Sequence, residues 1–287
     1  MKRLTTAILT FLLIGSLLAG CGGRPTEPDS TDPVDQPAAG PSVDVIPSYT
    51  MNEAMLNNGD IADADVTLVQ FATAAHGTHK AVIQTTMGDL EIILFEAQAP
   101  NAVKSFVIHA REGYYNGLTF DKILNNFVVE GGDPTGSGGE SALLDSAGNP
   151  APFANEYSLD LWHFRGAVSM SRLDSQAGNG SRFFMVQAPF VDKDTLEEME
   201  QAHFPAKVIE KYTEIGGTPG FDWKRTVFGV LTPDSLKVLD TIALTPVDED
   251  GLPENSVLIE NVTITELTPT ATVPATTVDE DEEPADE

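Results

Sequence analysis

The chain of 287 residues has little cysteine and little positive charge. Its only cysteine is Cys21, so no internal disulfide can form and the fold must rest on its core. It has 16 lysine and arginine residues against 44 aspartate and glutamate residues, which gives a formal net charge of -28. Because nucleic acid and anionic lipid headgroups repel an acidic surface, this charge argues against both as partners. We expect it to favour solubility.

Several patterns of metal, phosphate and nucleophilic chemistry are also missing. The glycine-rich stretches are not followed by Gly-Lys-Ser/Thr, so turns account for them better than a phosphate-binding loop does. His76 and His79 have the spacing of helical metal ligands, but no third ligand is evident. Ser169, Ser181 and the histidines form no recognisable triad pattern. We therefore expect neither a metal nor a cofactor.

The N-terminus has the features of an export signal. Lys2 and Arg3 precede an apolar stretch that ends near Leu18 and is short for a membrane-spanning helix. Small residues then lead to Cys21, and this run resembles the bacterial lipobox, in which the cysteine is acylated and becomes the new N-terminus. An ordinary signal with a chance cysteine is the alternative. We predict a signal peptide at residues 1–20 and an extracytoplasmic protein anchored to a bacterial membrane by lipidated Cys21.

The segments beside the folded part differ from it in composition. Residues 21–43 are mostly small, polar and proline, so we expect a flexible tether. Residues 268–287 end in a run of acidic side chains and are expected to be a disordered tail. Residues 44–78 form an N-terminal extension whose structure is uncertain. Within it, the pattern indicates a short helix at 52–58 and a short strand at 66–71.

Residues 79–267 are expected to form one domain of short strands and two helices. Strands are indicated by β-branched and aromatic runs between glycine-containing breaks. They are expected at residues 81–86, 90–95, 119–124, 127–130, 166–171, 182–187, 226–231 and 257–267, with the first two forming a hairpin. Helices are indicated between Pro100 and Gly113 and after Pro233. Many short strands with two helices suggest a closed barrel with helical caps.

Three groups of short motifs occur in order along this domain. They are Phe120-Asp121-Lys122-Ile123 with Phe127 and Glu130-Gly131-Gly132-Asp133-Pro134, then Gly166-Ala167-Val168-Ser169-Met170 with Gly180-Ser181-Arg182-Phe183-Phe184, then Thr226-Val227-Phe228-Gly229. In this order and spacing they resemble the cyclophilin-type peptidyl-prolyl cis-trans isomerases over about residues 80 to 267. The resemblance implies a mainly β fold: a closed antiparallel eight-stranded barrel capped by two helices. It also implies an enzyme that binds proline-containing peptides in an outer groove without a cofactor.

Catalysis of this isomerisation requires few functional groups from the protein. Rotation about a peptide bond faces a barrier of about 18 to 20 kcal/mol because amide resonance is lost, and no covalent bond is made or broken. The site must bind the twisted amide best. A hydrophobic pocket for the proline ring and a cation or donor near the amide satisfy this need.

Carried over by position, the resemblance implies that Lys122 is the catalytic residue, at a position where the family has arginine. The substrate-binding residues that it implies are Phe127, Val128, Glu130, Ser171, Arg182, Phe184, Phe221 and Arg225. An ammonium is a point charge and not a planar fork, so we expect Lys122 to weaken catalysis.

Other positions also depart from the family. Glu130 and Arg182 stand where the family usually has glutamine, and they either pair with each other or are solvated beside the groove. Arg225 stands where the family often has histidine, and the family's tryptophan falls on Gly220 and not on the nearby Trp223.

The segment at residues 190–217 is longer than in compact cyclophilins. Two helical pieces, at 195–203 and 206–215, are predicted on either side of a break at Pro205. We expect this insertion to flank the groove, where it either selects substrates or only packs beside the barrel.

Two functions fit these expectations. The first is a peptidyl-prolyl isomerase that assists the folding of exported proteins at the membrane surface, with unfolded exported proteins as partners. The second is a weakly active or inactive module on the same fold that binds proline-containing peptides as a chaperone. A solute-binding transport lipoprotein would share only the anchor, because its two α/β lobes are not visible in the pattern.

Overall fold

The computed structural model describes residues 61–135, 152–172 and 178–268 of the chain. The predictions for the signal peptide, for Cys21 and for the tether lie outside these residues, as do the helix at 52–58 and almost all of the acidic tail. Among the described helices, none combines the length and the apolar character needed to cross a membrane.

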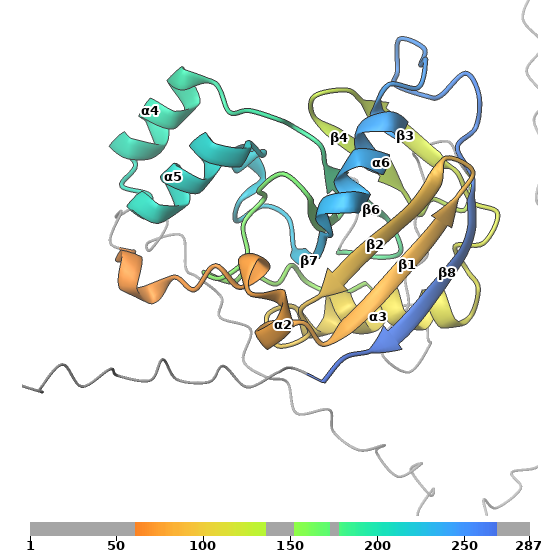
Figure 1. The fold of residues 1–287 in the computed structure, drawn as a ribbon, viewed down its shortest axis with the longest axis horizontal. Coiled ribbons are helices and arrows are strands. Elements are labelled where there is room, and N and C mark those ends of the chain that lie inside the picture. The colour runs from red at the N-terminus through yellow and green to blue at the C-terminus, as the bar shows by residue number, and fades with distance from the viewer. Residues whose placement is uncertain (1–60, 136–151, 173–177, 269–287) are drawn as a thin grey trace, which may run out of the picture. The chain divides into compact units, whose positions relative to one another are not determined.

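Eight short strands form one sheet, and all of them lie where the sequence pattern predicts strands (Figure 1). Their bounds are β1 His79–Thr85, β2 Gly88–Leu94, β3 Phe120–Leu124, β4 Val128–Gly131, β5 Ala167–Met170, β6 Phe183–Val186, β7 Val227–Leu231 and β8 Ile259–Glu266. Their order across the sheet is β3-β4-β6-β5-β7-β2-β1-β8, and each neighbouring pair is antiparallel. The prediction of a mainly β, eight-stranded antiparallel fold is confirmed.

The sheet curls into a half-barrel whose edge strands are β3 and β8. Within the described residues no ladder joins β3 to β8. An isolated bridge between Thr119 and Leu258, with backbone hydrogen bonds that link residues 117–120 to Val257 and Ile259, connects the two edges at one end only. Further along β3, Ile123 donates its backbone N–H to the carbonyl of Gly251 at 2.8 Å. The loop after the last helix thus pairs with the edge of β3 that β8 would need for closure. The prediction of a closed barrel is therefore not confirmed.

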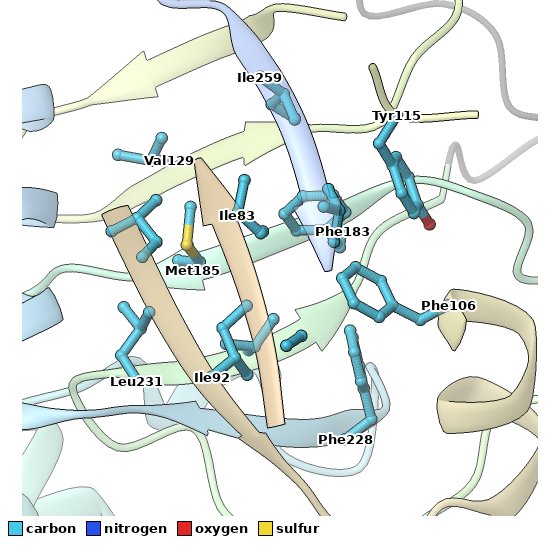
Figure 2. Close-up of a cluster of buried hydrophobic side chains, with 14 of the residues drawn as sticks. Ile83, Ile92, Phe106, Tyr115, Val129, Phe183, Met185, Phe228, Leu231 and Ile259 are labelled. Atoms are coloured by element: carbon cyan, nitrogen blue, oxygen red, sulfur yellow. The ribbon is translucent and has the colours of Figure 1, made fainter. Parts of the chain in front are cut away.

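The core fills the concave side of this sheet. In β1 and β2 the inward side chains alternate with outward ones, as a sheet with one buried face requires. Figure 2 shows Ile83, Ile92, Val129 and Met185 from four different strands converging with Phe106 from a helix. Every residue of β5 and β6 is buried, so both faces of these two strands are covered.

The helices are α3 Pro100–Arg111, α4 Lys193–Gln201, α5 Ala206–Ile215 and α6 Pro233–Ala243. Proline occupies the first turn of α3 and of α6, where its missing N–H leaves no hydrogen bond unmade. The N-cap residue of α3 is Ala99, whose side chain makes no capping hydrogen bond. Instead the carboxylate of Glu156 accepts the backbone N–H groups of Asn101 and Ala102 at 3.0 and 2.9 Å. The two capping helices and the two helical pieces at 190–217 are where the sequence predicts them.

The predicted strand at 66–71 is wrong. The structure has short 3-10 helices η1 at Asp63–Asp65 and η2 at Val69–Phe71, followed by a single turn, α2, at Thr73–His76. The side chain of Gln70 exchanges two hydrogen bonds with the backbone of Trp162, at 3.0 and 2.9 Å. Because these bonds join groups 92 residues apart, the local pattern of residues 66–71 carries no sign of them.

Helices α4 and α5 have a small core of their own. Met199, Val208 and Tyr212 pack against Trp162 and Phe164, which lie just before β5. This packing holds the 190–217 segment beside the chain that enters β5, where Arg165 also donates its backbone N–H to the carbonyl of Gly216 at 3.2 Å. A third short 3-10 helix, η3 at Pro219–Phe221, then leads the chain from α5 into β7.

Candidate active site

The hairpin of β3 and β4 carries two acidic residues and one lysine. Lys122 lies directly opposite Glu130 in the ladder, and the register shifts between Phe120 and Lys122. Asp121 therefore sits in a bulge with no partner in β4. As a result Asp121 is buried, whereas Lys122 is exposed.

The turn of this hairpin presents Phe127. Asn126 adopts a φ of 62°, a left-handed conformation that asparagine tolerates better than most residues. Phe127 donates its backbone N–H to the carbonyl of Leu124 at 3.0 Å, and its own carbonyl accepts the N–H groups of Gln187 and Ala188 at 2.8 and 3.1 Å. The backbone is thus held on both sides, and Phe127 as a whole remains 38% exposed.

Three aromatic rings from separate elements form an apolar pocket. Phe221 from η3 lies 5.4 Å from Phe127 and 5.2 Å from Phe184 of β6, measured between ring centroids. Val128 and Phe184 are buried, whereas Phe127 and Phe221 are partly accessible. The lining of this pocket is apolar, as is expected of a pocket that binds a proline ring.

A buried guanidinium lies beside the pocket among three carboxylates. Arg182 is 2% exposed and donates from Nη2 to Glu130 Oε1 and, at 3.3 Å, to Asp121 Oδ2. Its Nη1 lies 3.8 Å from Asp133 Oδ2. Ser171 also donates to Glu130 Oε1, at 2.6 Å. Of the two alternatives for Glu130 and Arg182, the structure shows the pair and excludes two independently solvated charges.

The ionisation of Asp121 is perturbed by this environment. Burial raises the pKa of its carboxyl from 3.8 to about 6, against the attraction of Arg182, and the negative charges of Glu130 and Asp133 add to the increase. Its Oδ1 accepts no hydrogen bond within the part of the chain that the structure describes. A carboxyl in this position exchanges a proton close to neutral pH.

All nine residues that the sequence predicts for catalysis and substrate binding line one groove, which has a volume of about 510 Å³. Its full lining is Asp121, Lys122, Leu124, Phe127, Val128, Glu130, Ser171, Arg172, Arg182, Phe184, Phe221, Arg225, Asp248, Asp250 and Leu252. Four of these side chains are acidic and four are basic. Although the whole chain is strongly acidic, the groove is balanced in formal charge, so electrostatics do not exclude peptides of either sign.

Sequence reasoning missed six residues of the groove, among them Leu124 of β3. Asp121 and Arg172 are adjacent in sequence to the predicted residues Lys122 and Ser171, so this adjacency could have indicated that they line the groove. Asp248, Asp250 and Leu252 belong to the loop between α6 and β8, and nothing in the local pattern points to the groove. Only the pairing of this loop with β3 brings them there.

Neither Gly220 nor Trp223 places a tryptophan side chain in the groove. A side chain added at Gly220 would meet no atom within 4 Å, so this position is open. Trp223 points elsewhere, because its ring lies 5.1 Å from Trp162 and 6.3 Å from Tyr157. The aromatic wall on this side of the groove is therefore Phe221 alone.

The groove combines an apolar pocket with cationic side chains. Within residues 61–135, 152–172 and 178–268, no set of three or more His, Cys, Asp or Glu side chains is arranged to hold a metal ion. A second cavity of about 570 Å³, lined by Phe71, Ile93, Arg165, Ile215, Leu236 and their neighbours, contains none of the predicted site residues.

Comparison with known proteins agrees with this geometry. Residues 80–264 match the family model described as cyclophilin type peptidyl-prolyl cis-trans isomerase/CLD. A protein of Staphylococcus aureus (strain USA300) named for peptidyl-prolyl cis-trans isomerase activity is 38% identical over 192 residues, which are 66% of this chain and 93% of the relative. A relative with the same name from Staphylococcus epidermidis (strain ATCC 12228 / FDA PCI 1200) is 40% identical over 189 residues, 65% of this chain and 92% of the relative.

A solved structure shows the same fold. The cyclophilin type peptidyl-prolyl cis-trans isomerase of Cryptosporidium parvum, crystallised in the presence of the dipeptide Ala-Pro, matches with a TM-score of 0.50 and 26% identity. The match covers 65% of this chain and 98% of that one. Together with the nine residues that meet in one groove, these matches show that the chain belongs to the cyclophilin-type peptidyl-prolyl cis-trans isomerase family.

Proposed function

We propose that this protein catalyses cis-trans isomerisation of X-Pro bonds in exported proteins at a membrane surface, with Lys122 as the catalytic cation. The signal-like N-terminus and Cys21 support the location. The groove supports the substrate, because an apolar pocket and a lysine share it. Proline-containing peptides and unfolded exported proteins are the partners in this proposal.

The environment of the Lys122 side chain supports the proposed catalytic role. Its side chain is exposed and makes no hydrogen bond or ion pair with any residue that the structure describes. Glu130, directly opposite in the ladder, is already engaged by Arg182 and Ser171. The ammonium is therefore free to turn toward a bound amide and favour the state in which the amide nitrogen has lost conjugation.

The experiment measures cis-trans exchange of an Ala-Pro peptide by the full chain purified in mild detergent. Lys122→Ala should lower kcat/KM by about 10- to 100-fold, the effect of losing one charge-assisted hydrogen bond in the transition state. Lys122→Arg should raise it, because a guanidinium donates two hydrogen bonds in fixed geometry. Lys237→Ala is the matched control, since Lys237 is an exposed lysine on α6 outside the groove.

The outcomes separate the two functions. Loss of exchange in Lys122→Ala but not in Lys237→Ala supports the isomerase. Wild-type binding of proline peptides without exchange above background would instead favour the chaperone module. Equal rates in Lys122→Ala and in the wild type would remove Lys122 from catalysis.

A further inference from the structure

A buried chain of hydrogen bonds runs from helix α5 to strand β5. Tyr212 of α5 donates its hydroxyl to Asp222 Oδ2 at 2.7 Å. Asp222 Oδ1 lies 2.8 Å from His163 Nδ1 and accepts the backbone N–H of His163 at 3.0 Å. His163 Nε2 in turn lies 3.0 Å from Ser169 Oγ. No local sequence pattern indicates this arrangement, because His163 and Asp222 are 59 residues apart.

This order of serine, histidine and aspartate is not a nucleophilic triad. Ser169 is 0% exposed, and its hydroxyl donates to the carbonyl of Thr226 at 2.9 Å. The cavity beside His163 and Asp222 has a volume of about 10 Å³, room for one water at most. No substrate reaches the serine, so the chain of hydrogen bonds serves to hold its members in place.

This chain of hydrogen bonds fixes one wall of the apolar pocket, the wall that consists of Phe184 and Phe221. The ring of His163 stacks on Phe184 with centroids 6.0 Å apart and planes 12° from parallel, and it lies 5.9 Å from the ring of Phe221. Asp222 follows Phe221 directly at the end of η3. Because η3 is a single turn of three residues outside the sheet, its position depends on such anchors.

Asp222 is a strong anchor because three donors meet its carboxylate. Two come from His163, which precedes β5, and the third comes from Tyr212. Burial, and secondly the charge of Asp222, raise the pKa of the Tyr212 phenol above its ordinary value, so the hydroxyl remains a donor. The Tyr212 hydroxyl thus links the helical segment 190–217 to the residue that follows Phe221.

We infer that Tyr212, Asp222 and His163 are positioning residues, through which the 190–217 segment fixes Phe221 and Phe184 and so sets the affinity of the groove for proline. This inference rests on the proposed function, because it takes this groove as the substrate site. It also gives the helical segment a role in substrate affinity beyond packing beside the sheet. The hydroxyl acts on binding and not on the twisted amide, so KM should respond while kcat does not.

The test compares two tyrosine variants of the full chain. Tyr212→Phe removes only the hydroxyl that reaches Asp222. Tyr115→Phe is the matched control, since Tyr115 is also fully buried and also donates one hydrogen bond, to the carbonyl of Ser181 at 3.0 Å. We expect both variants to lower Tm, but only Tyr212→Phe to raise KM for an Ala-Pro peptide, by about three- to tenfold, with kcat within about twofold of the wild type.

A double variant tests the route. If Tyr212 acts through Asp222, the effect of Tyr212→Phe on KM should shrink in an Asp222→Asn background, where the carboxylate is already absent. Should Tyr212→Phe fail to fold, Asp222→Asn carries the same comparison with Tyr115→Phe. An unchanged KM in the Tyr212 variant, or an equal rise in the Tyr115 variant, would overturn the inference.

Failure of the proposed function gives a different result. If the wild type shows no exchange, the dissociation constant of the peptide from an NMR titration replaces KM, and the same pattern of variants is expected. A groove that binds no proline peptide in a folded wild type would overturn both proposals.

Discussion

The charge of Asp121 offers a sharp test of the buried cluster. The Asp121 side chain is 0% exposed, its Oδ2 accepts a hydrogen bond from Arg182 at 3.3 Å, and burial is the chief cause that raises its pKa to about 6. Asparagine has nearly the same shape and mimics the protonated acid without titrating. Asp121→Asn therefore removes the titration and leaves the packing.

The sign and the size of the effect follow from proton binding. Below pH 3.8 the carboxyl is protonated in both the folded and the unfolded chain, and its contribution to stability is complete. Between 3.8 and about 6 the folded chain binds more protons than the unfolded one, so the free energy of unfolding falls as the pH rises. At about 1.4 kcal/mol for each pH unit of this difference, the total loss above pH 6 is about 3 kcal/mol.

The assay is urea unfolding of the full chain and of Asp121→Asn at a series of pH values from about 3.5 to 8. Other carboxylates titrate in both proteins, so the difference between the two free energies isolates Asp121. We expect the two proteins to be about equally stable near pH 4 and the variant to be more stable by about 3 kcal/mol above pH 7. Asp250→Asn, at an exposed site of the same groove, should stay within about 0.5 kcal/mol of the wild type throughout.

A difference between wild type and Asp121→Asn that does not change with pH would refute the raised pKa. A variant that is less stable above pH 7 would show that the ion pair with Arg182 outweighs burial. Either result would contradict the reasoning for the whole cluster.

Three further predictions concern the anchor and the frame of the site. Cys21→Ser should release the protein from membranes into the soluble fraction, and unchanged membrane partition with the signal still processed would remove lipidation as the tether. Glu156→Ala should lower the free energy of unfolding by about 2 kcal/mol in urea titration, because α3 loses the carboxylate that accepts its first N–H groups. An unchanged free energy of unfolding would mean that solvent caps the helix equally well. Gly217→Ala should lower the free energy of unfolding by about 2 kcal/mol or more in the same assay, since φ is +138° and the added Cβ would lie 2.5 Å from the carbonyl oxygen of His163. A smaller decrease would mean that the backbone at Gly217 moves easily.

The strands and the main helices could be predicted because their signals are local. In β1 and β2, Ile83 and Ile92 belong to alternating patterns that specify one buried face wherever the strands lie. Pro100 and Pro233 mark helix starts through their own covalent geometry. The groove could be predicted as well, because motif order fixes which strand each residue occupies.

The remaining features depend on contacts between distant segments. The loop that carries Asp248 reaches the groove only because Gly251 pairs with Ile123 of β3, and that same pairing occupies the edge needed for a closed barrel. Nothing near residue 250 in the sequence indicates this partner. The chain of hydrogen bonds from Tyr212 to Ser169 is hidden for the same reason, since each member lies in a segment that looks ordinary alone.

The departures of this chain from the family's site are linked by geometry. Glu130 lies directly across the ladder from Lys122, and a carboxylate at that distance would attract the ammonium away from a substrate. Arg182 prevents this, because its guanidinium already holds Glu130 inside the protein. Glu130 and Arg182 thus engage each other, and Lys122 makes no ion pair with any residue that the structure describes. Under the proposal that Lys122 is the catalytic cation, the buried ion pair determines which charge the substrate meets.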